Sequence, residues 1–519
     1  MSMITAGETQ GRPPKAWAVE GSFCLLAVAC VAAWYSWQFL DLFPLAEYRD
    51  WINTPMSWAD VVTVGRQMLT QDNPPGFCRC VSWCYARLSG LLAGTNTYGL
   101  NGLALLVVVA SCLPAYGLCR QVAIKPFGSL AVVLLWAFSL PTIDIVAWQA
   151  SLHDRCALLF ILLSLNLAMA ILRPMRKKSA QAAAVLGLTL CVFAAYNSKE
   201  MAFLLMPSML LLILFAGADT WIGKLKQAAL FAIPLLYVGY HNLRYVYYLR
   251  HADDTTHCLG GSLAANWRVA LSQCLGSAGD FNVREVGVCA TFVIAIALGV
   301  LVAWSLQGLR ASPDVRRRFG LNLWLWMNFG MAIAITLKTQ CQPPYERYIP
   351  QFFLFLAAVQ GLSLLGDLPW RGERAVRWIG CAALSLLLCW NGYYFFTRVS
   401  RPYQELARLS RHFATSMAEA HRQVDLLRQD RIELVIPLSS MDLYLFSNGT
   451  PMGLLRLVTP PGDAARARHL PTINGVSGVD LKQWRPSDSG TCYICFTHEM
   501  TLDSIYCGGK RLVPAAIRN

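Results

Sequence analysis

Residues 148–165 read WQASLHDRCALLFILLSL, and this stretch decides how the rest of the chain is interpreted. Three ionisable residues, His153, Asp154 and Arg155, come directly before an uncharged apolar run. Ionisable side chains where a hydrocarbon-buried segment begins are costly, so we expect them to lie at the membrane interface and to serve a function there. The stretch therefore predicts one wall of an active site on the outer face of a membrane enzyme.

The composition is that of a membrane protein. Of 519 residues, 55% are hydrophobic and 14% are charged, whereas about a quarter of the residues of a soluble protein are charged. Lys and Arg number 44 against 30 Asp and Glu, which gives a net charge of +14. Such an excess is also typical of nucleic-acid binders. Its placement along the chain instead predicts a role in membrane topology and no nucleic-acid partner.

We count about eleven apolar runs that approach the length of about 20 residues needed to cross a bilayer. They are residues 23–40, 98–119, 127–143, 156–172, 180–196, 201–216, 228–242, 286–306, 321–337, 348–365 and 378–396. The first run follows Arg12 and Lys15 and continues well past the small pair Ala29 and Cys30. It is therefore interpreted as an uncleaved first span and not as a secretory signal.

Basic loops fix the expected orientation. With residues 1–22 in the cytoplasm, the inner loops are basic segments, namely 120–125, 173–178, 219–226, 310–318 and 371–377. Lys and Arg mark the cytoplasmic side of short loops, and the turns on the other side hold one or two such residues each. This pattern predicts a multi-pass protein of the bacterial inner membrane, with a cytoplasmic N-terminus and a periplasmic C-terminus.

Three longer segments then fall on the outer side. Residues 41–97 contain two amphipathic stretches, 57–69 and 78–92, that fit helices lying in the interface plane, and residues 244–285 form a second loop. Residues 398–519 form a polar region with a charged helix followed by a few strands. The predicted fold is an all-α polytopic membrane domain over residues 23–397, with a small α+β periplasmic region after it.

Eighteen cysteines are present, and about half lie in the predicted spans, where cysteine is a small apolar packing residue. An oxidising periplasm would allow disulfides outside the spans, and the pair Cys258 and Cys274 is one candidate. A pair within the C-terminal region is another. Cys492 and Cys495 form a C-x-x-C motif that fits a zinc half-site or a redox pair, but a second matching pair is missing from the sequence.

Carboxylates and cations abut the spans at four turns on the outer side. These are Glu47 and Asp50 in LDLFPLAEYRDW (40–51), the HDR cluster at 153–155, Lys199 and Glu200 in YNSKE (196–200), and Glu346 and Arg347 in PPYERYIP (343–350). The shared side predicts that they meet in one pocket at the outer membrane surface. Because all four turns lie on one side, we interpret these residues as parts of one functional site and not as unrelated surface charges.

Such a pocket suits transfer of one sugar from a polyprenyl-phosphate donor. The phosphate of the lipid lies at headgroup level, where Arg or Lys would bind it. The acceptor hydroxyl needs a carboxylate to take its proton as the new bond forms. The leaving phosphate needs its charge stabilised by cations, or by a divalent metal held on carboxylates. The acceptor would be a periplasmic glycan, lipid or protein.

Four stretches resemble the GT-C superfamily of polytopic glycosyltransferases. They are LDLFPLAEYRDW, WQASLHDRCALLFILLSL, AAYNSKEMAFLLMP (194–207) and PPYERYIPQFFLFLA (343–357). The superfamily includes the protein O-mannosyltransferases, the aminoarabinose transferases of lipid A and the oligosaccharyltransferase catalytic subunits. The resemblance extends over residues 40–357 and leaves the C-terminal region without a match.

The resemblance implies roles for individual residues. Family members carry an acidic catalytic residue in the first outer loop, usually in an adjacent acidic pair. Here the two carboxylates are separated by two residues, and Asp50 is the first candidate for the base, with Glu47 second. Asp154 matches a second acidic position that binds metal or substrate. A divalent metal, where one is used, would be held by Asp50 and Asp154.

The other residues of the four turns are assigned to the substrate by the same resemblance. Arg155, Lys199 and Arg347 match cations that hold the donor phosphate, and His153, Glu200 and Glu346 complete the predicted substrate-binding set. Non-catalytic interpretations stay open: Asp50 as a solvated loop residue, Arg155 and Lys199 as interface anchors, and Glu346–Arg347 as a local ion pair.

Two other functions also remain open. A transporter or lipid flippase would be expected to carry ionisable residues near the middle of its spans, whereas the predicted spans here are nearly free of charge. A polyprenyl-linked glycan polymerase or ligase would use a long outer loop rich in Arg and His late in the chain, of which residues 244–285 are a modest version.

Overall fold

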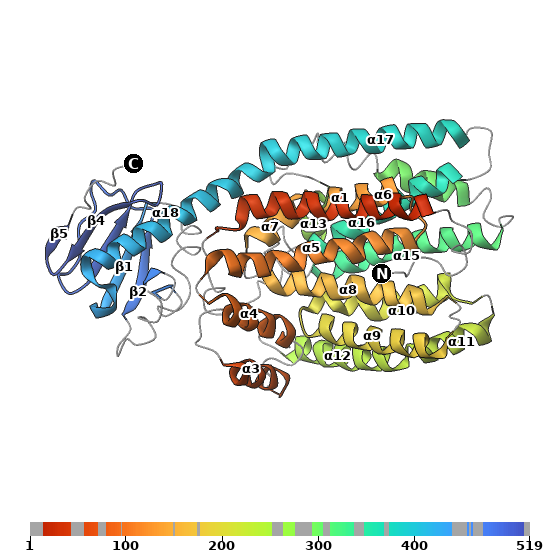
Figure 1. The fold of residues 1–519 in the computed structure, drawn as a ribbon, viewed down its shortest axis with the longest axis horizontal. Coiled ribbons are helices and arrows are strands. Elements are labelled where there is room, and N and C mark those ends of the chain that lie inside the picture. Colours follow the sequence, from red (N-terminus) through yellow and green to blue (C-terminus); the bar gives the residue numbers. More distant parts are fainter. Residues whose placement is uncertain are drawn as a thin grey trace.

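The computed structural model describes residues 14–42, 57–70, 79–94, 96–148, 151–173, 177–218, 220–251, 263–275, 293–304, 312–336, 347–367, 373–437, 454–455, 458–459 and 471–512. A helical bundle and a small C-terminal α/β domain make up the molecule (Figure 1). The domain lies beyond one end of the bundle, which we call the tail end. The opposite end, where α15 and α17 begin, is called the far end.

Most bundle helices run along the long axis of the molecule (Figure 1). They are α1 (Pro14–Phe39), α5 (Thr97–Gln121), α6 (Pro126–Ala137), α7 (Leu140–Ala147), α8 (Leu152–Ile171), α9 (Lys178–Tyr196), α10 (Leu205–Ala216), α15 (Pro313–Thr336), α16 (Tyr348–Asp367) and α17 (Glu373–Tyr394). α16 and α8 are buried along most of their length, whereas α1 and α9 are mainly exposed along theirs. Helices that are apolar all round belong either in a protein core or in lipid, and both environments occur here.

The protein is a multi-pass membrane protein, with six described helices long and apolar enough to cross a membrane, or up to eight if each bent pair is one span. The predicted count of about eleven is therefore not confirmed. The other predicted spans fall on helices that are shorter, at Met201–Ala216 and Val293–Trp304, or that begin with a basic turn, as α15 does.

The predicted span at 127–143 is broken. α6 and α7 meet at an angle of 54° around Phe138 and Ser139, and Pro141 stands in the first turn of α7, where it costs no helical hydrogen bond. Backbone carbonyls freed by the break are taken up by side chains, because Tyr35 donates to Ala137 O at 2.6 Å and Asn391 to Phe138 O at 2.7 Å. Broken spans persist in lipid only with such replacement partners.

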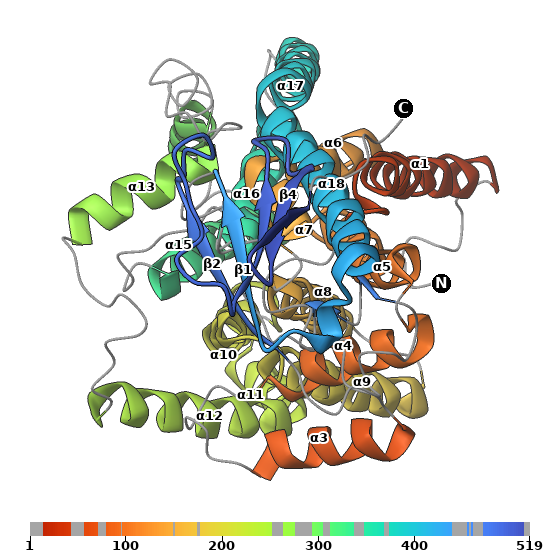
Figure 2. The ribbon, with the colours of Figure 1, turned by 90° about the vertical axis from the view of Figure 1, so that its left-hand side faces the viewer.

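Short helices surround the two ends of the bundle. At the tail end lie α3 (Trp58–Thr70) and α4 (Cys80–Ala93), which match the two predicted amphipathic stretches (Figure 2). A 3-10 turn η2 (Glu200–Leu204) precedes α10, and α11 (Trp221–Leu230) bends into α12 (Ala232–His251). α13 (Leu263–Leu275) lies in the second predicted outer loop.

The C-terminal domain confirms the predicted helix followed by strands. Its helix α18 (Ser400–Val424) continues α17 through a π turn (Phe395–Val399), and a short turn (Leu426–Arg428) follows it. The strands are β1 (Arg431–Ile436), β2 (Thr472–Ser477), β3 (Cys492–Phe496), β4 (Leu502–Cys507) and β5 (Lys510–Leu512). They form one sheet in the order β2-β1-β3-β4-β5, in which β1 runs parallel to β2 and β3, and β3, β4 and β5 are antiparallel.

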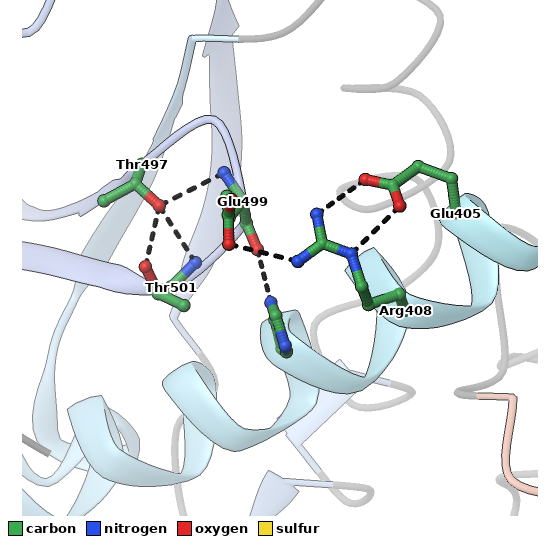
Figure 3. A network of polar contacts seen from close by, with 6 residues as sticks. Glu405, Arg408, Thr497, Glu499 and Thr501 are labelled. Atoms are coloured by element: carbon green, nitrogen blue, oxygen red, sulfur yellow. Dashed lines mark hydrogen bonds and ion pairs between the residues drawn. The ribbon is translucent and has the colours of Figure 1, made fainter. Parts of the chain in front are cut away.

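One face of this sheet packs against α18, and polar contacts add to the apolar ones. Phe413 of α18 lies with its ring centroid 5.3 Å from that of Phe496. Arg408 bridges Glu405 on its own helix and Glu499 in the β3–β4 turn, at 2.6 and 3.0 Å (Figure 3). His412 contacts the carbonyl of Glu499 at 2.8 Å. The helix and the sheet thus form one unit.

Two contacts attach α18 to the tail end of the bundle. Tyr403 donates to the Asp144 carboxylate in α7 at 2.8 Å, and Arg411 lies 2.9 Å from the Asp41 carboxylate just after α1. Both carboxylates were predicted to lie on the outer side. They hold the C-terminal domain at the end of the bundle where the candidate site is found.

Candidate functional site

The site is built around the first turn of α8 at the tail end. His153, Asp154 and Arg155 are only 3%, 4% and 0% exposed. Burial of ionisable groups is expensive unless each gains a partner. Their partners come from α4, α5, α7 and the turn between α9 and η2, so four separate segments are fixed around this turn.

Arg155 is bound by backbone carbonyls. Its Nε donates to Ile145 O at 2.9 Å, and its Nη2 donates to Ile145 O at 2.5 Å and to Val146 O at 3.0 Å. Its Nη1 donates to Ala104 O in α5 at 3.2 Å. Because the last carbonyls of a helix lack intrahelical partners and carry partial negative charge, Arg155 closes the C-terminus of α7. These contacts make it a positioning residue for the wall formed by α7 and α8.

His153 connects α8 to α4. Its Nδ1 lies 2.5 Å from Ser82 Oγ, and that hydroxyl donates to Arg79 O at 3.0 Å. A hydroxyl has one proton to give, so the proton of this contact belongs to Nδ1. The backbone N–H of Val81 also donates to Asn197 O at 2.9 Å. The start of α4 is thereby held against both α8 and the end of α9.

A buried ion pair lies beside this contact. Lys199 Nζ is 3.8 Å from Asp154 Oδ2, and the two side chains are 14% and 5% exposed. Arg79 and Lys199 both act electrostatically on His153. Among the described side chains, two cations and one carboxylate therefore gather around the first turn of α8.

The start of α16 forms the other side of the site. Arg347 is fully buried, and its Nε donates to Gln273 Oε1 of α13 at 3.0 Å. Gln351 Nε2 donates to Cys274 O at 3.2 Å, which also holds α13 in place. Tyr348, which directly follows Arg347, is 1% exposed, and its hydroxyl has no hydrogen-bond partner among the described residues. The charges of Asp154 and Arg155 lie near enough to act on Tyr348, which places the start of α16 in the same region as the first turn of α8.

The structure thus brings together His153, Asp154 and Lys199, whereas Arg347 at the start of α16 contacts Gln273 of α13. Glu47, Asp50 and Glu346 lie outside the described residues, and for Glu200 only the backbone is described. No group of three His, Cys, Asp or Glu that could hold a metal is found within the described ranges. A metal between Asp50 and Asp154 stays a prediction, because one of its two ligands lies outside them.

Sequence reasoning missed Arg79, Ser82 and Tyr348. Arg79 and Ser82 stand at the start of the predicted interfacial stretch 78–92, where a basic residue before a helix was an available signal. Tyr348 directly follows Arg347 in the ERYIP motif, and its apolar neighbours hid it among residues of the next span. All three are placed by tertiary packing, which the linear pattern does not contain.

The comparisons with known proteins found a similar chain only among solved structures. No protein-family model matches the sequence, and no curated protein matches it. Among solved structures, the chain is similar to the crystal structure of ArnT from Cupriavidus metallidurans in the apo state. The identity is 11%, the TM-score is 0.45, and the match covers 86% of this chain and 89% of that chain. ArnT is an aminoarabinose transferase of the GT-C class. The similarity concerns the fold alone.

Proposed function

We propose that this protein is a membrane glycosyltransferase that transfers one sugar from a polyprenyl-phosphate donor to an acceptor hydroxyl at the tail end of the bundle. The observation that carries the proposal is the cluster of buried Asp154 and His153 with partly buried Lys199 and Arg79 at the end of apolar helices. A charged site at that level suits a substrate that is part lipid and part anion. The acceptor is a periplasmic glycan, lipid or protein.

In this reaction Lys199 and Arg79 hold the donor phosphate, and Arg347 contributes from α16. Charge builds on the leaving phosphate as its bond to the sugar breaks, and fixed cations in a site shielded from water stabilise that charge. Asp154 keeps Lys199 in position and balances part of its charge. Arg155 supports the wall through α7 and has its donors directed to carbonyls, so it acts on the substrate indirectly.

The acceptor reacts by direct displacement with inversion. A carboxylate of the first outer loop, Asp50 with Glu47 as the second candidate, takes the proton of the acceptor hydroxyl. The acceptor oxygen then forms a bond to the anomeric carbon while the bond from that carbon to the phosphate oxygen breaks. Polyprenyl phosphate leaves with the electron pair. A divalent metal between Asp50 and Asp154 would stabilise the same leaving charge.

The test uses purified full-length protein in lipid nanodiscs with a panel of polyprenyl-phosphate sugars and a labelled acceptor extract. Asp50→Asn and Glu47→Gln are assayed separately, because loss of a general base lowers the rate by about 100-fold or more. Unchanged rates in both variants would remove the proposed base. Gene deletion followed by mass spectrometry of the surface glycans and lipids should show loss of a single sugar, which would identify the donor and the acceptor together.

The tail end is proposed to face the periplasm. Basic loops support this, because the described residues Lys125, Arg318 and Arg377 gather at the far end around Asp367, as expected for the cytoplasmic side. A membrane-impermeant maleimide applied to spheroplasts should label an added cysteine at the exposed Ser487 and should spare one at the exposed Ser312. The reverse pattern would place the site in the cytoplasm and would contradict the proposal.

A further inference from the structure

A second cavity lies at the far end, remote from the candidate site. Its volume is about 1200 Å³, and it is bounded by the end of α8, the α10–α11 turn and the start of α15. Four cations line it, namely Arg173, Lys226, Arg316 and Arg317, and its described lining includes one carboxylate, Asp314. The cavity therefore offers a strongly positive surface at the level of the lipid headgroups.

An apolar groove adjoins this cavity. It has a volume of about 570 Å³ and lies between α10, the helix Val293–Trp304 and α15. Its walls include Leu298, Leu301 and Leu323, which are 56%, 60% and 50% exposed. Side chains of this kind that face outward within a membrane-spanning region contact lipid and not water.

The cavity and the groove share two residues, Phe215 of α10 and Arg316 of α15. Where the cavity meets the groove, α10 and α15 approach closely: a Cβ added to Gly320 of α15 would lie 3.1 Å from Phe215 O of α10. Arg316 therefore has the positive cavity on one side and the apolar groove on the other. The result is a continuous site with a cationic end and an apolar end.

The preference of basic residues for the cytoplasmic side accounts for their number at the far end but not for this arrangement. Lys125, Arg318 and Arg377 are gathered around the Asp367 carboxylate at 3.0, 2.9 and 3.6 Å. The described lining of the cavity, in contrast, contains four cations and one carboxylate, Asp314. An anionic head with attached acyl chains matches both parts of the site at once, and basic pockets between membrane helices bind such lipids.

We propose that the cavity and the groove together form a binding site for an anionic glycerophospholipid. The phosphodiester headgroup lies among Arg173, Lys226, Arg316 and Arg317, and an acyl chain occupies the groove between α10 and α15. This inference is independent of the proposed glycosyl transfer, because it concerns the opposite end of the bundle. Bound lipid would join α10 to α15 and hold the far end closed.

The experiment measures lipid retention by the full-length protein. Protein in a mild detergent is titrated with phosphatidylglycerol, and bound lipid is counted by native mass spectrometry. Phosphatidylethanolamine tests the need for net negative charge, and glycerol phosphate tests the need for acyl chains. We expect retention of phosphatidylglycerol, weak retention of phosphatidylethanolamine and no displacement by glycerol phosphate. Displacement by glycerol phosphate, or equal retention of both lipids, would overturn the proposal.

Matched variants assign the site. Arg316→Gln with Arg317→Gln should weaken phosphatidylglycerol binding about tenfold, since each cation near the headgroup adds to the attraction. The control, Lys178→Gln with Arg374→Gln, removes two exposed cations of the far end that do not line the cavity, and it should bind as the native protein does. Leu298→Trp should fill the groove and reduce retention without loss of surface charge. Equal losses in the cavity and control variants, or full retention by Leu298→Trp, would refute the site.

Discussion

Lys199 Nζ lies 3.8 Å from Asp154 Oδ2, and the two residues belong to segments that are separated by the whole of α9. Both side chains are almost completely removed from solvent. Breaking a buried ion pair by removing one partner leaves an uncompensated charge and costs about 3–5 kcal/mol. The pair therefore fixes the α9–η2 turn against α8. Substitution of its two residues shows whether the cluster has a functional role, a structural role or both.

A double-mutant cycle on this pair separates the two roles. Lys199→Met leaves Asp154 without its cation and should lower the free energy of unfolding by about 3 kcal/mol. Lys199→Met combined with Asp154→Asn removes both charges and should recover part of that loss. Denaturation in detergent, monitored by tryptophan fluorescence, gives the stabilities. Additive losses would show that the two side chains do not interact in the folded protein.

The same variants probe the donor phosphate. Because Lys199 is proposed to bind the donor, the double variant should regain stability but not donor affinity. We expect a rise of about tenfold or more in the KM for the donor, as one charge-assisted hydrogen bond is lost. The matched control is Lys178→Met, which removes a lysine exposed at the far end. Native donor affinity in the Lys199 variants would refute the phosphate role.

Substitution of Arg155 is expected to lower stability and to leave donor affinity unchanged. Its guanidinium serves several carbonyls of α7 and α5 at once, and the single ammonium of lysine cannot reproduce that fork. Arg155→Lys should therefore lower the free energy of unfolding by about 2–3 kcal/mol and leave the donor KM near its native value at temperatures where the variant stays folded. A selective loss of donor affinity with native stability would instead support direct phosphate binding.

These residues also show what could be predicted from sequence. The pattern of charges before an apolar run located the first turn of α8, and the basic loops located the far end. The resemblance assigns Arg155 to the donor phosphate, and nothing in the sequence shows that a short helix ends at Ala147. That end leaves the carbonyls of Ile145 and Val146 without helical partners, and Arg155 donates to both.

The contacts of α4 could not be predicted from the sequence either. An amphipathic stretch at 78–92 predicts a helix in the interface plane, and the helix is confirmed. Ser82 meets His153 because the backbone of Val81 is held by Asn197, a contact between residues more than 100 positions apart. Such long-range pairings depend on the packing of the whole bundle, so local periodicity carries no signal for them.

A partly buried hydrogen bond of Tyr403 helps to attach the C-terminal domain, together with the ion pair of Arg411 with Asp41. Tyr403→Phe removes the hydroxyl that binds Asp144, and a hydrogen bond to a charged group is worth about 1.5–3 kcal/mol. We expect faster backbone hydrogen exchange in the first turns of α18 and in α7. The control is Arg408→Gln, since the exposed pairs of Arg408 with Glu405 and Glu499 (Figure 3) contribute at most about 1 kcal/mol. Equal exchange in both variants would show that Tyr403 does not anchor the domain.

The last prediction concerns the cysteines of the sheet. Cys492 and Cys495 are three residues apart in β3, so they point to opposite faces. Cys492 packs on the α18 side and Cys495 on the side of Trp484 and Tyr506. This geometry does not fit the zinc half-site or the redox pair suggested by the C-x-x-C motif. Cys507 is instead the expected partner of Cys492, because Tyr493 pairs with Tyr506 in the antiparallel register and this places the two cysteines opposite each other.

Directly opposed residues of antiparallel strands have Cα atoms about 4.5–5.5 Å apart, which is within the range of disulfides. In an oxidising compartment we expect Cys492 and Cys507 to form one. A disulfide-bearing oxidoreductase would accept the two electrons, and each thiol would lose its proton. Mass spectrometry of peptides from the unreduced protein should find the Cys492–Cys507 link. A link from Cys495 to either of these residues would contradict the strand register.

Reduced protein gives a pH test of the same arrangement. Burial raises the pKa of the Cys495 thiol to about 12, and burial together with the hydrogen bond that the Cys492 thiol donates to Cys507 raises the pKa of Cys492. The thiolate is the reactive form, so both thiols should alkylate slowly at pH 7 and faster with each unit of rising pH while the domain stays folded. In urea-unfolded protein both thiols should be alkylated at the rate of an ordinary thiol. Rapid alkylation of the folded, reduced domain at pH 7 would show that these side chains are not buried against α18 and Trp484.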